Sequence, residues 1–230
     1  MIIETDMTHE EAWYKEKLAQ RCLTAMKKHN IQGHYSPDRS HARAQILEMI
    51  PPGVTIGAGD SVTLAQIGVL EELEKRGSHQ MFNPFRKNGE DCMPSSLREL
   101  VETGKQALLT DFFLTGINAI TLDGKIINTD RTGNRASGLF FGPKKVIAVT
   151  GINKIVANLE EALERIKQIA APINAYRHQI KHDMDAPPCA ITGVCVDCNH
   201  ARRVCCYTVI VEYQTSPRIE LVIVGEELGI

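Results

Sequence analysis

A short apolar strand that leads into a glycine loop and then a helix is the sequence feature that most limits the fold. Residues 54–56 predict the strand, residues 57–61 the loop, and residues 62–76 a helix that ends at Gly77. The alternation of helix and strand is repeated over residues 95–115, where a predicted helix precedes a buried strand. Helices and strands that alternate in this way are typical of a parallel sheet with crossover helices. The sequence therefore predicts an α/β fold.

All predicted elements fit one domain over residues 1–230. Residues 117–129 indicate a turn and a hairpin, with the bend at Asp123 and Gly124. The other predicted elements are helices at 12–29 and 41–50 and strands at 145–150, 207–213 and 219–224.

The chain is predicted to become less regular after a helix at 159–170, because Pro172 is expected to end that helix. Residues 178–199 are rich in proline, histidine and cysteine and are expected to be irregular. A cysteine-rich excursion from the sheet, at about 186–206, is expected to bind metal.

Composition and charge restrict the partners. The chain of 230 residues has a formal net charge of -2 and a pI of about 6.4, so nucleic acid is not an expected partner. No apolar stretch is long enough to span a bilayer. The acidic N-terminus lacks the features of a signal peptide, which predicts a cytoplasmic protein. A homo-oligomer is compatible with the sequence.

The glycine loop is a candidate anion site. Gly57 and Gly59 let the backbone approach a ligand closely, and Ser61 stands at a helix N-terminus that can attract an anion. The loop matches neither the Walker pattern nor the dinucleotide fingerprint, and Asp60 would repel a phosphate. A tight strand-to-helix turn capped by Asp60 or Ser61 is the alternative interpretation.

A polar segment between apolar strands supplies further candidates. Polar loops at the carboxyl ends of parallel strands bind ligands in α/β proteins, and arginine can bind a carboxylate in a bidentate fork. Asn134 and Arg135 are therefore predicted to contact a ligand, since turn chemistry does not account for them. Asp130 is the candidate general acid or base, although arginines nearby would lower its pKa and make it a poor acid near neutral pH.

Five of the seven cysteines lie between Cys189 and Cys206. Because cytosolic thiols stay reduced, such a cluster indicates metal binding rather than disulfides. The predicted ligands are Cys189, Cys195, Cys198 and Cys205, and Cys206 could take the place of Cys205. The spacing fits a tetrahedral zinc site or an iron–sulfur cluster and does not decide between them.

Several sequence blocks together resemble one family, the LUD (lactate-utilization) domain family, which includes LutC-like proteins. The glycine loop falls where that family has one, and longer members resemble the cysteine pattern as well. The blocks that carry the resemblance are residues 115–120, 123–124, 128–135, 141–146, 151–155 and 170–174.

The resemblance implies a fold similar to ribose-5-phosphate isomerase, glucosamine-6-phosphate deaminase and the CoA transferases, which is an open, mostly parallel sheet with helices on both faces. In those relatives the first glycine loop and the central acidic segment line the active site. The resemblance thus implies pocket roles for Gly57, Gly59, Ser61, Asn118 and Asp130. No convincing counterpart of the nucleophilic glutamate of CoA transferases is present, which argues against acyl transfer.

Three functions follow as hypotheses, and whether the chain is an enzyme stays open. The first is a subunit of organic-acid (lactate) utilization that binds a small anionic ligand and an iron–sulfur cluster or zinc, with iron–sulfur redox proteins as partners. The second is a sugar-phosphate isomerase or CoA-transferase-like enzyme with a structural zinc site. The third is a non-catalytic assembly or regulatory protein.

Overall fold

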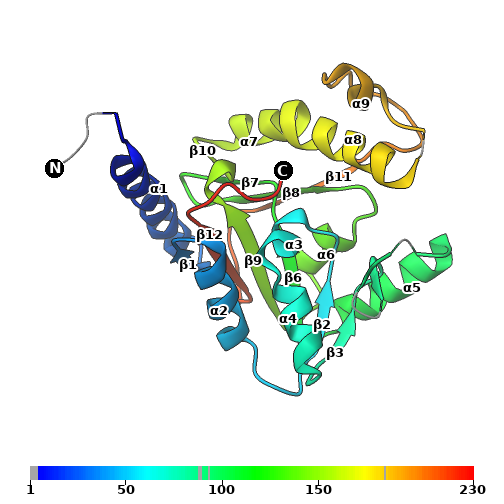
Figure 1. Ribbon diagram of the computed structural model, residues 1–230, viewed down its shortest axis with the longest axis horizontal. Helices are drawn as coiled ribbons and strands as arrows, with labels where there is room; N and C mark the ends of the chain where they lie inside the picture. The colour runs from blue at the N-terminus through cyan, green and yellow to red at the C-terminus, as the bar shows by residue number, and fades with distance from the viewer. Residues whose placement is uncertain (1–4, 88–89, 93, 184) are drawn as a thin grey trace.

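Six strands form the main sheet of the computed structural model, which describes residues 5–87, 90–92, 94–183 and 185–230. Every neighbouring pair in this sheet runs parallel. The predicted parallel α/β sheet is confirmed (Figure 1). In spatial order the strands are β1 (Gln32–Ser36), β12 (Ile219–Val224), β9 (Lys145–Gly151), β6 (Phe112–Gly116), β2 (Thr55–Ala58) and β3 (Gln80–Phe82).

Helices cover both faces of this sheet. Successive side chains of a strand point to opposite faces, and β6 shows the division. Phe113 packs in a core cluster with Met26, while Leu114 packs in another with Leu64. The first face carries α1 (Thr8–Lys28), α5 (Leu97–Leu108) and α6 (Asn134–Phe140), and the second carries α2 (Arg39–Met49), α3 (Val62–Ile67) and α4 (Val69–Arg76).

A second, four-stranded sheet contains the predicted hairpin, whose bend at Gly124 has a φ of 93°. The hairpin does not extend the main sheet, because Ala119 and Ile127 are buried against Ala162 and Ile166 in a core of their own. The strands, in order, are β10 (Ile155–Val156), β7 (Ala119–Thr121), β8 (Ile126–Asp130) and β11 (Tyr207–Val211). A short pair, β4 (Arg86–Lys87) and β5 (Glu90–Asp91), stands apart.

The helical run near the C-terminus is longer than predicted. After α7 (Leu159–Arg165), a π-helical segment at Ile166–Ala170 leads directly into α8 (Ala171–His182). Pro172 therefore does not end the helix. It lies in the first turn of α8, where a helix tolerates a residue without an N–H.

The longer α8 and the short helix α9 (Pro188–Thr192) replace much of the segment expected to be irregular. Both lie with α7 along one end of the molecule in Figure 1. No helix in the described ranges is long and apolar enough to cross a membrane.

Candidate functional site

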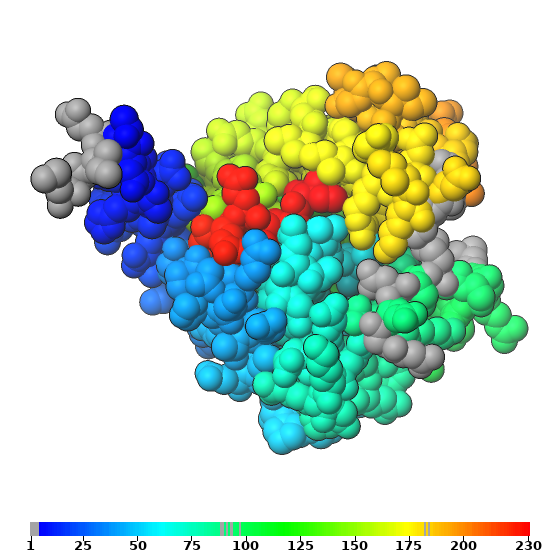
Figure 2. All heavy atoms as spheres, in the orientation of Figure 1, coloured from blue at the N-terminus to red at the C-terminus, as the bar shows by residue number. Residues whose placement is uncertain are grey.

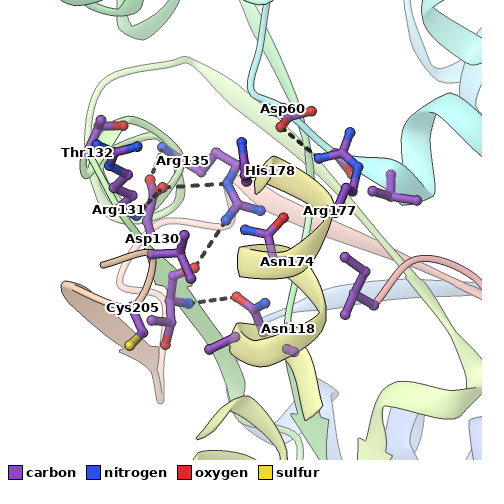
Figure 3. A pocket seen from close by; sticks show the side chains of 18 of the residues that line it. Asp60, Asn118, Asp130, Arg131, Thr132, Arg135, Asn174, Arg177, His178 and Cys205 are labelled. Atoms are coloured by element: carbon purple, nitrogen blue, oxygen red, sulfur yellow. Dashed lines mark hydrogen bonds and ion pairs between the residues drawn. The ribbon is translucent and has the colours of Figure 1, made fainter. Parts of the chain in front are cut away.

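A cavity of about 340 Å³ opens at the carboxyl ends of β2 and β6. Asp60 and Gly116 border it where these strands end, and Arg135 borders it at the start of α6. The opposite wall is a face of α8 that carries Asn174 and Arg177 (Figure 3). In Figure 2 the α8 segment, in yellow, lies against the cyan segment that contains α3. The cavity is therefore enclosed by elements far apart in the sequence.

Basic side chains outnumber acidic ones in the lining of this cavity. Two side-chain carboxylates, Asp60 and Asp130, also line it, but both have cationic or N–H partners. Ile230 lines it too, and its oxygen accepts from the Arg165 Nη1 at 3.3 Å. An excess of positive charge on low-dielectric walls concentrates anions. The basic lining residues are four arginines, Arg131, Arg135, Arg177 and Arg202, and Lys154.

Asp130 holds the start of α6 in place. Its Oδ1 accepts a hydrogen bond from the backbone N–H of Arg131, and its Oδ2 accepts one from that of Arg135, each at 2.8 Å. The Arg135 Nε lies 3.8 Å from Oδ1. The carboxylate is 5 % exposed and lines the cavity. Both oxygens thus have structural partners, and the catalytic role of Asp130 stays a prediction.

Arg135 accounts for the glycine at position 59. A Cβ on Gly59 would stand 2.3 Å from the Arg135 Cγ, so the arginine side chain crosses the glycine loop where a side chain is absent. The guanidinium then donates from Nη2 to the Thr129 carbonyl at 3.1 Å. This path brings Arg135 into the cavity wall. Gly59 makes the path possible because it has no side chain.

Gly57 serves packing in the same way. A Cβ there would stand 2.4 Å from the carbonyl oxygen of Ala107, so α5 lies directly on the strand. Gly57 is not among the residues that line the cavity. Ser61 does line it, and its Oγ accepts from the Leu64 N–H at 3.3 Å as the cap of α3. The structure therefore separates the three predicted loop residues into two packing glycines and one cavity residue.

The two predicted asparagines both line the cavity. The Asn118 Oδ1 accepts from the backbone N–H of Thr129 at 2.7 Å, which ties the chain after β6 to β8. The Asn134 Oδ1 accepts from the Thr132 hydroxyl at 2.7 Å at the start of α6. Each side-chain amide keeps its NH₂ group for a further partner.

Asp60 and Arg177 form an ion pair across the cavity, with 3.3 Å between Oδ2 and Nη1. Burial alone would raise the pKa of Asp60, but Arg177, with the charges of Arg135 and His178, lowers that pKa below its ordinary value. The pair links the glycine loop to α8. Asp60 therefore stays charged near neutral pH, and its charge is balanced by Arg177 rather than free to repel an anion.

Lys154, which sequence reasoning missed, lies in the cavity wall and is 3 % exposed. Its Nζ donates to the Thr63 hydroxyl at 3.0 Å and to the Ile117 carbonyl at 3.2 Å. Burial, together with the charges of Arg165 and Arg135, lowers the pKa of Lys154 to about 7. A polar residue just after the buried strand β9 was the available signal.

Four cysteines line a second, small cavity of about 10 Å³, and they are the four predicted ligands: Cys189, Cys195, Cys198 and Cys205. Burial raises the pKa of the Cys189 thiol, and the charges of the other three add to the shift. Among the described residues, no three potential ligands stand close enough to hold a metal ion as placed. The donor set fits a thiolate metal site, and the sulfurs would have to come closer together to share one ion.

Arg203 organises this loop. Its Nη1 donates to the Cys198 carbonyl at 2.6 Å and its Nε to the Cys205 carbonyl at 3.0 Å, while Nη2 pairs with Asp197. Cys206 is exposed, and its Sγ donates to the Arg203 carbonyl at 3.3 Å. Cys205 lines the cysteine cavity and the large cavity together. This geometry favours Cys205 over Cys206 as a ligand.

The sheet and its lining define an α/β protein with a cationic cavity at the carboxyl ends of parallel strands. The family model of the LUD domain matches residues 19–224, so the chain belongs to the LUD domain family, which is associated with lactate utilization. A DUF162 family protein from Deinococcus radiodurans has a similar solved structure. It is 14% identical, with a TM-score of 0.52 over 91% of this chain and 97% of that chain, and at this identity it supports the fold alone. The search of curated proteins gave no match.

Proposed function

We propose that this LUD protein binds a small organic carboxylate in the large cavity and serves organic-acid (lactate) metabolism. One observation carries the proposal: four arginines line the cavity, while both aspartates that line it already have partners. Arg131 and Arg202 line the same cavity as Arg135 and Arg177. A guanidinium offers paired N–H donors that match a carboxylate.

Sugar phosphates and acyl-CoA compounds are the competing ligand class. Their phosphates would meet the same arginines, and about 340 Å³ is within the range of cavities that hold larger organic ligands. Lactate and pyruvate would fill only part of this space. A comparison of these ligand classes therefore decides between the two functions.

Thermal unfolding with lactate, pyruvate, phosphosugars and acyl-CoA compounds tests the proposal. A ligand at 100 times its Kd stabilises the native state by about 2.7 kcal/mol, so we expect lactate or pyruvate to raise Tm. R135Q should weaken binding about 10- to 100-fold, because a hydrogen bond to a charged group contributes about 1.5–3 kcal/mol. R21Q, on the exposed face of α1, is the matched control. A response to phosphosugars or acyl-CoA alone, or to no compound, contradicts the proposal.

We further propose that Cys189, Cys195, Cys198 and Cys205 hold metal. Four thiolates would bind either zinc, as a structural ion, or an iron–sulfur cluster able to exchange electrons with iron–sulfur partner proteins. All four cysteines line one small cavity, which supports a single shared site for them. Only an iron–sulfur cluster can transfer electrons. The identity of the bound metal therefore distinguishes an electron-transfer role from a structural role.

Metal analysis of protein purified without oxygen is the test. Brown protein with iron and acid-labile sulfide supports the electron-transfer version, and colourless protein with stoichiometric zinc supports a structural site. C195S and C198S should each lose the metal, whereas C92S, outside the loop, should keep it. Protein without bound metal, or metal retained in both loop variants, contradicts the proposal.

A further inference from the structure

Lys154 is a buried amine in the cavity wall. No Asp or Glu in the described ranges forms an ion pair with it, and the groups that contact its Nζ are the Thr63 hydroxyl, the Ile117 carbonyl and the backbone at Gly229. Ile230 lines the same cavity, and its oxygen accepts from the Arg165 Nη1 at 3.3 Å. The charged groups that act on it are Arg165 and Arg135, both cations. An isolated ammonium in such a place is costly. The surroundings therefore favour the neutral amine.

The hydrogen bonds of Lys154 are consistent with this neutral state. Nζ contacts two groups that accept, the Thr63 hydroxyl and the Ile117 carbonyl. In the neutral amine these two acceptors take both N–H protons, and the nitrogen lone pair stays available. An amine with an unused lone pair is a nucleophile toward carbonyl groups.

Groups that can bind a carboxylate line the same cavity as this amine. Arg135 is near enough to lower the pKa of Lys154, Arg177 lines the cavity as well, and Asn118 follows Ile117, whose carbonyl accepts from Nζ. A ligand with a carboxylate and an adjacent carbonyl could therefore meet arginine with the first group and the amine with the second. A 2-oxo acid has this arrangement. A 2-hydroxy acid has a hydroxyl at C2 and therefore no keto carbonyl that the amine could attack.

We propose that Lys154 forms an imine with a 2-oxo acid bound in the cavity. The inference rests on the proposed carboxylate-binding function and names the class of ligand that reacts. The Nζ lone pair forms a bond to C2 of the oxo acid, the C=O π electrons move to oxygen, and one proton passes from nitrogen to this oxygen. The carbinolamine then loses its remaining N–H proton and its hydroxyl group, which together make one water, and the C=N bond forms. No oxidant or reductant takes part.

Trapping with pyruvate and sodium borohydride tests this step. Borohydride reduces an imine to a stable secondary amine, which peptide mapping by mass spectrometry assigns to one lysine. We expect the adduct to concentrate on the peptide that contains Lys154, to saturate with pyruvate, and to fall when lactate competes. K154M should lose this adduct. K167M, which removes an exposed lysine of the neighbouring helical run, should keep it.

The outcomes separate the imine from the binding function. If pyruvate and lactate both raise Tm but no adduct forms on Lys154, the imine proposal fails and the carboxylate proposal stands. If neither ligand raises Tm and no adduct forms, both fail. An adduct spread over exposed lysines, unchanged by lactate, also overturns the imine. The peptide map of the trapped native-sequence protein assigns the adduct to a lysine. The test therefore does not depend on whether K154M folds.

Discussion

The residues of the large cavity depend closely on one another. Arg135 crosses Gly59 and bonds to the Thr129 carbonyl, so its position requires the absence of a side chain at 59. Asp130 in turn binds the backbone of Arg135. A substitution at any of these positions should move the Arg135 side chain and thereby change the affinity for the ligand.

G59A tests this dependence. A methyl group would stand 2.3 Å from the Arg135 Cγ, so the arginine must leave its present path. Overpacking of this kind costs about 1–3 kcal/mol, and we expect carboxylate affinity to fall about tenfold or more, as measured by calorimetric titration. G104A is the control, because its Cβ would meet Asn134 at an ordinary 3.8 Å. Unchanged affinity in G59A would show that Arg135 does not contact the ligand.

D130A separates a structural from a catalytic role. The substitution leaves the part-buried N–H groups of Arg131 and Arg135 without their carboxylate acceptor, and a hydrogen bond to a charged group contributes about 1.5–3 kcal/mol. We expect a lower midpoint in urea denaturation. D130N, which keeps one acceptor oxygen, should recover part of the loss. Full stability in D130A would contradict the structural assignment.

Sequence reasoning found part of this residue constellation. Asn118, Asp130, Asn134 and Arg135 come from one polar segment, and all line the cavity. Arg177 was missed because Pro172 was expected to end its helix. The cavity contacts depend on tertiary packing that no local pattern encodes, so side chains from α8 could not be assigned.

At the scale of elements, Asp111 joins β2 to β6 at the start of both strands. It accepts from the Thr55 N–H at 2.9 Å and the Thr55 hydroxyl at 2.8 Å, and its other oxygen pairs with Lys144 at 2.6 Å. The Lys144 hydrogen bond, followed by those of Thr55, lowers the pKa of Asp111 far below its ordinary value.

D111N should therefore be less stable than the native chain at pH 7. A depressed folded-state pKa contributes stability above the unfolded value of about 3.9, and this contribution is lost as pH falls through the lower folded value. We expect the difference in urea midpoint between the two proteins to be full at pH 7 and to shrink below about pH 4. A difference that grows toward acid would contradict the assignment.

Cys189 and Val204 pack against α8, but other apolar side chains of the cysteine loop are exposed. Ile191 is 77 % exposed and Val196 is 59 % exposed. If metal holds the loop, a chelator should make it sensitive to proteases, because the free energy of metal binding is then also the free energy of folding. We expect limited proteolysis with a chelator to cleave within 193–206 before the rest of the chain. Equal protection with and without chelator would contradict a metal-held loop.

Predictions of elements succeeded where the pattern was strong. The hairpin at Gly124 and the strands β9 and β12 were found from turn chemistry and apolar runs. The edge strand β1 was missed, since its sequence Gln-Gly-His-Tyr-Ser is polar, and pairing with β12 alone makes it a strand. The division of the strands into separate sheets was missed as well. It depends on which buried cluster the side chains of each strand pack in, and this is a matter of tertiary structure.

At the scale of the whole molecule, burial of Lys154 makes stability depend on pH. Burial lowers its folded-state pKa to about 7, while the unfolded chain has an ordinary lysine. Between about pH 7 and 10 the unfolded state then binds the extra proton, so this residue adds about 1.4 kcal/mol of stability per pH unit. K154M should remove this rise and be the more stable protein at pH 6, as measured by urea denaturation. An identical pH dependence in both proteins would contradict the lowered pKa.

The fold as a whole was predictable because strand, loop and helix repeat along the chain and because blocks of the sequence resemble one family. The chemical groups of the cavity were less predictable than the fold. Lys154 is a single lysine after a buried strand, and its character comes from groups at distant positions, Thr63 and Arg165 among them. Ligand, metal and oligomeric state stay predictions.

Cys205 forms part of the wall of both cavities. If each cavity has its own occupant, the two binding equilibria share a side chain and are thermodynamically linked. Linkage is reciprocal, so that any factor by which a bound ion alters the affinity for the organic acid must equally alter the affinity for the ion. A titration of either occupant would then report on the other.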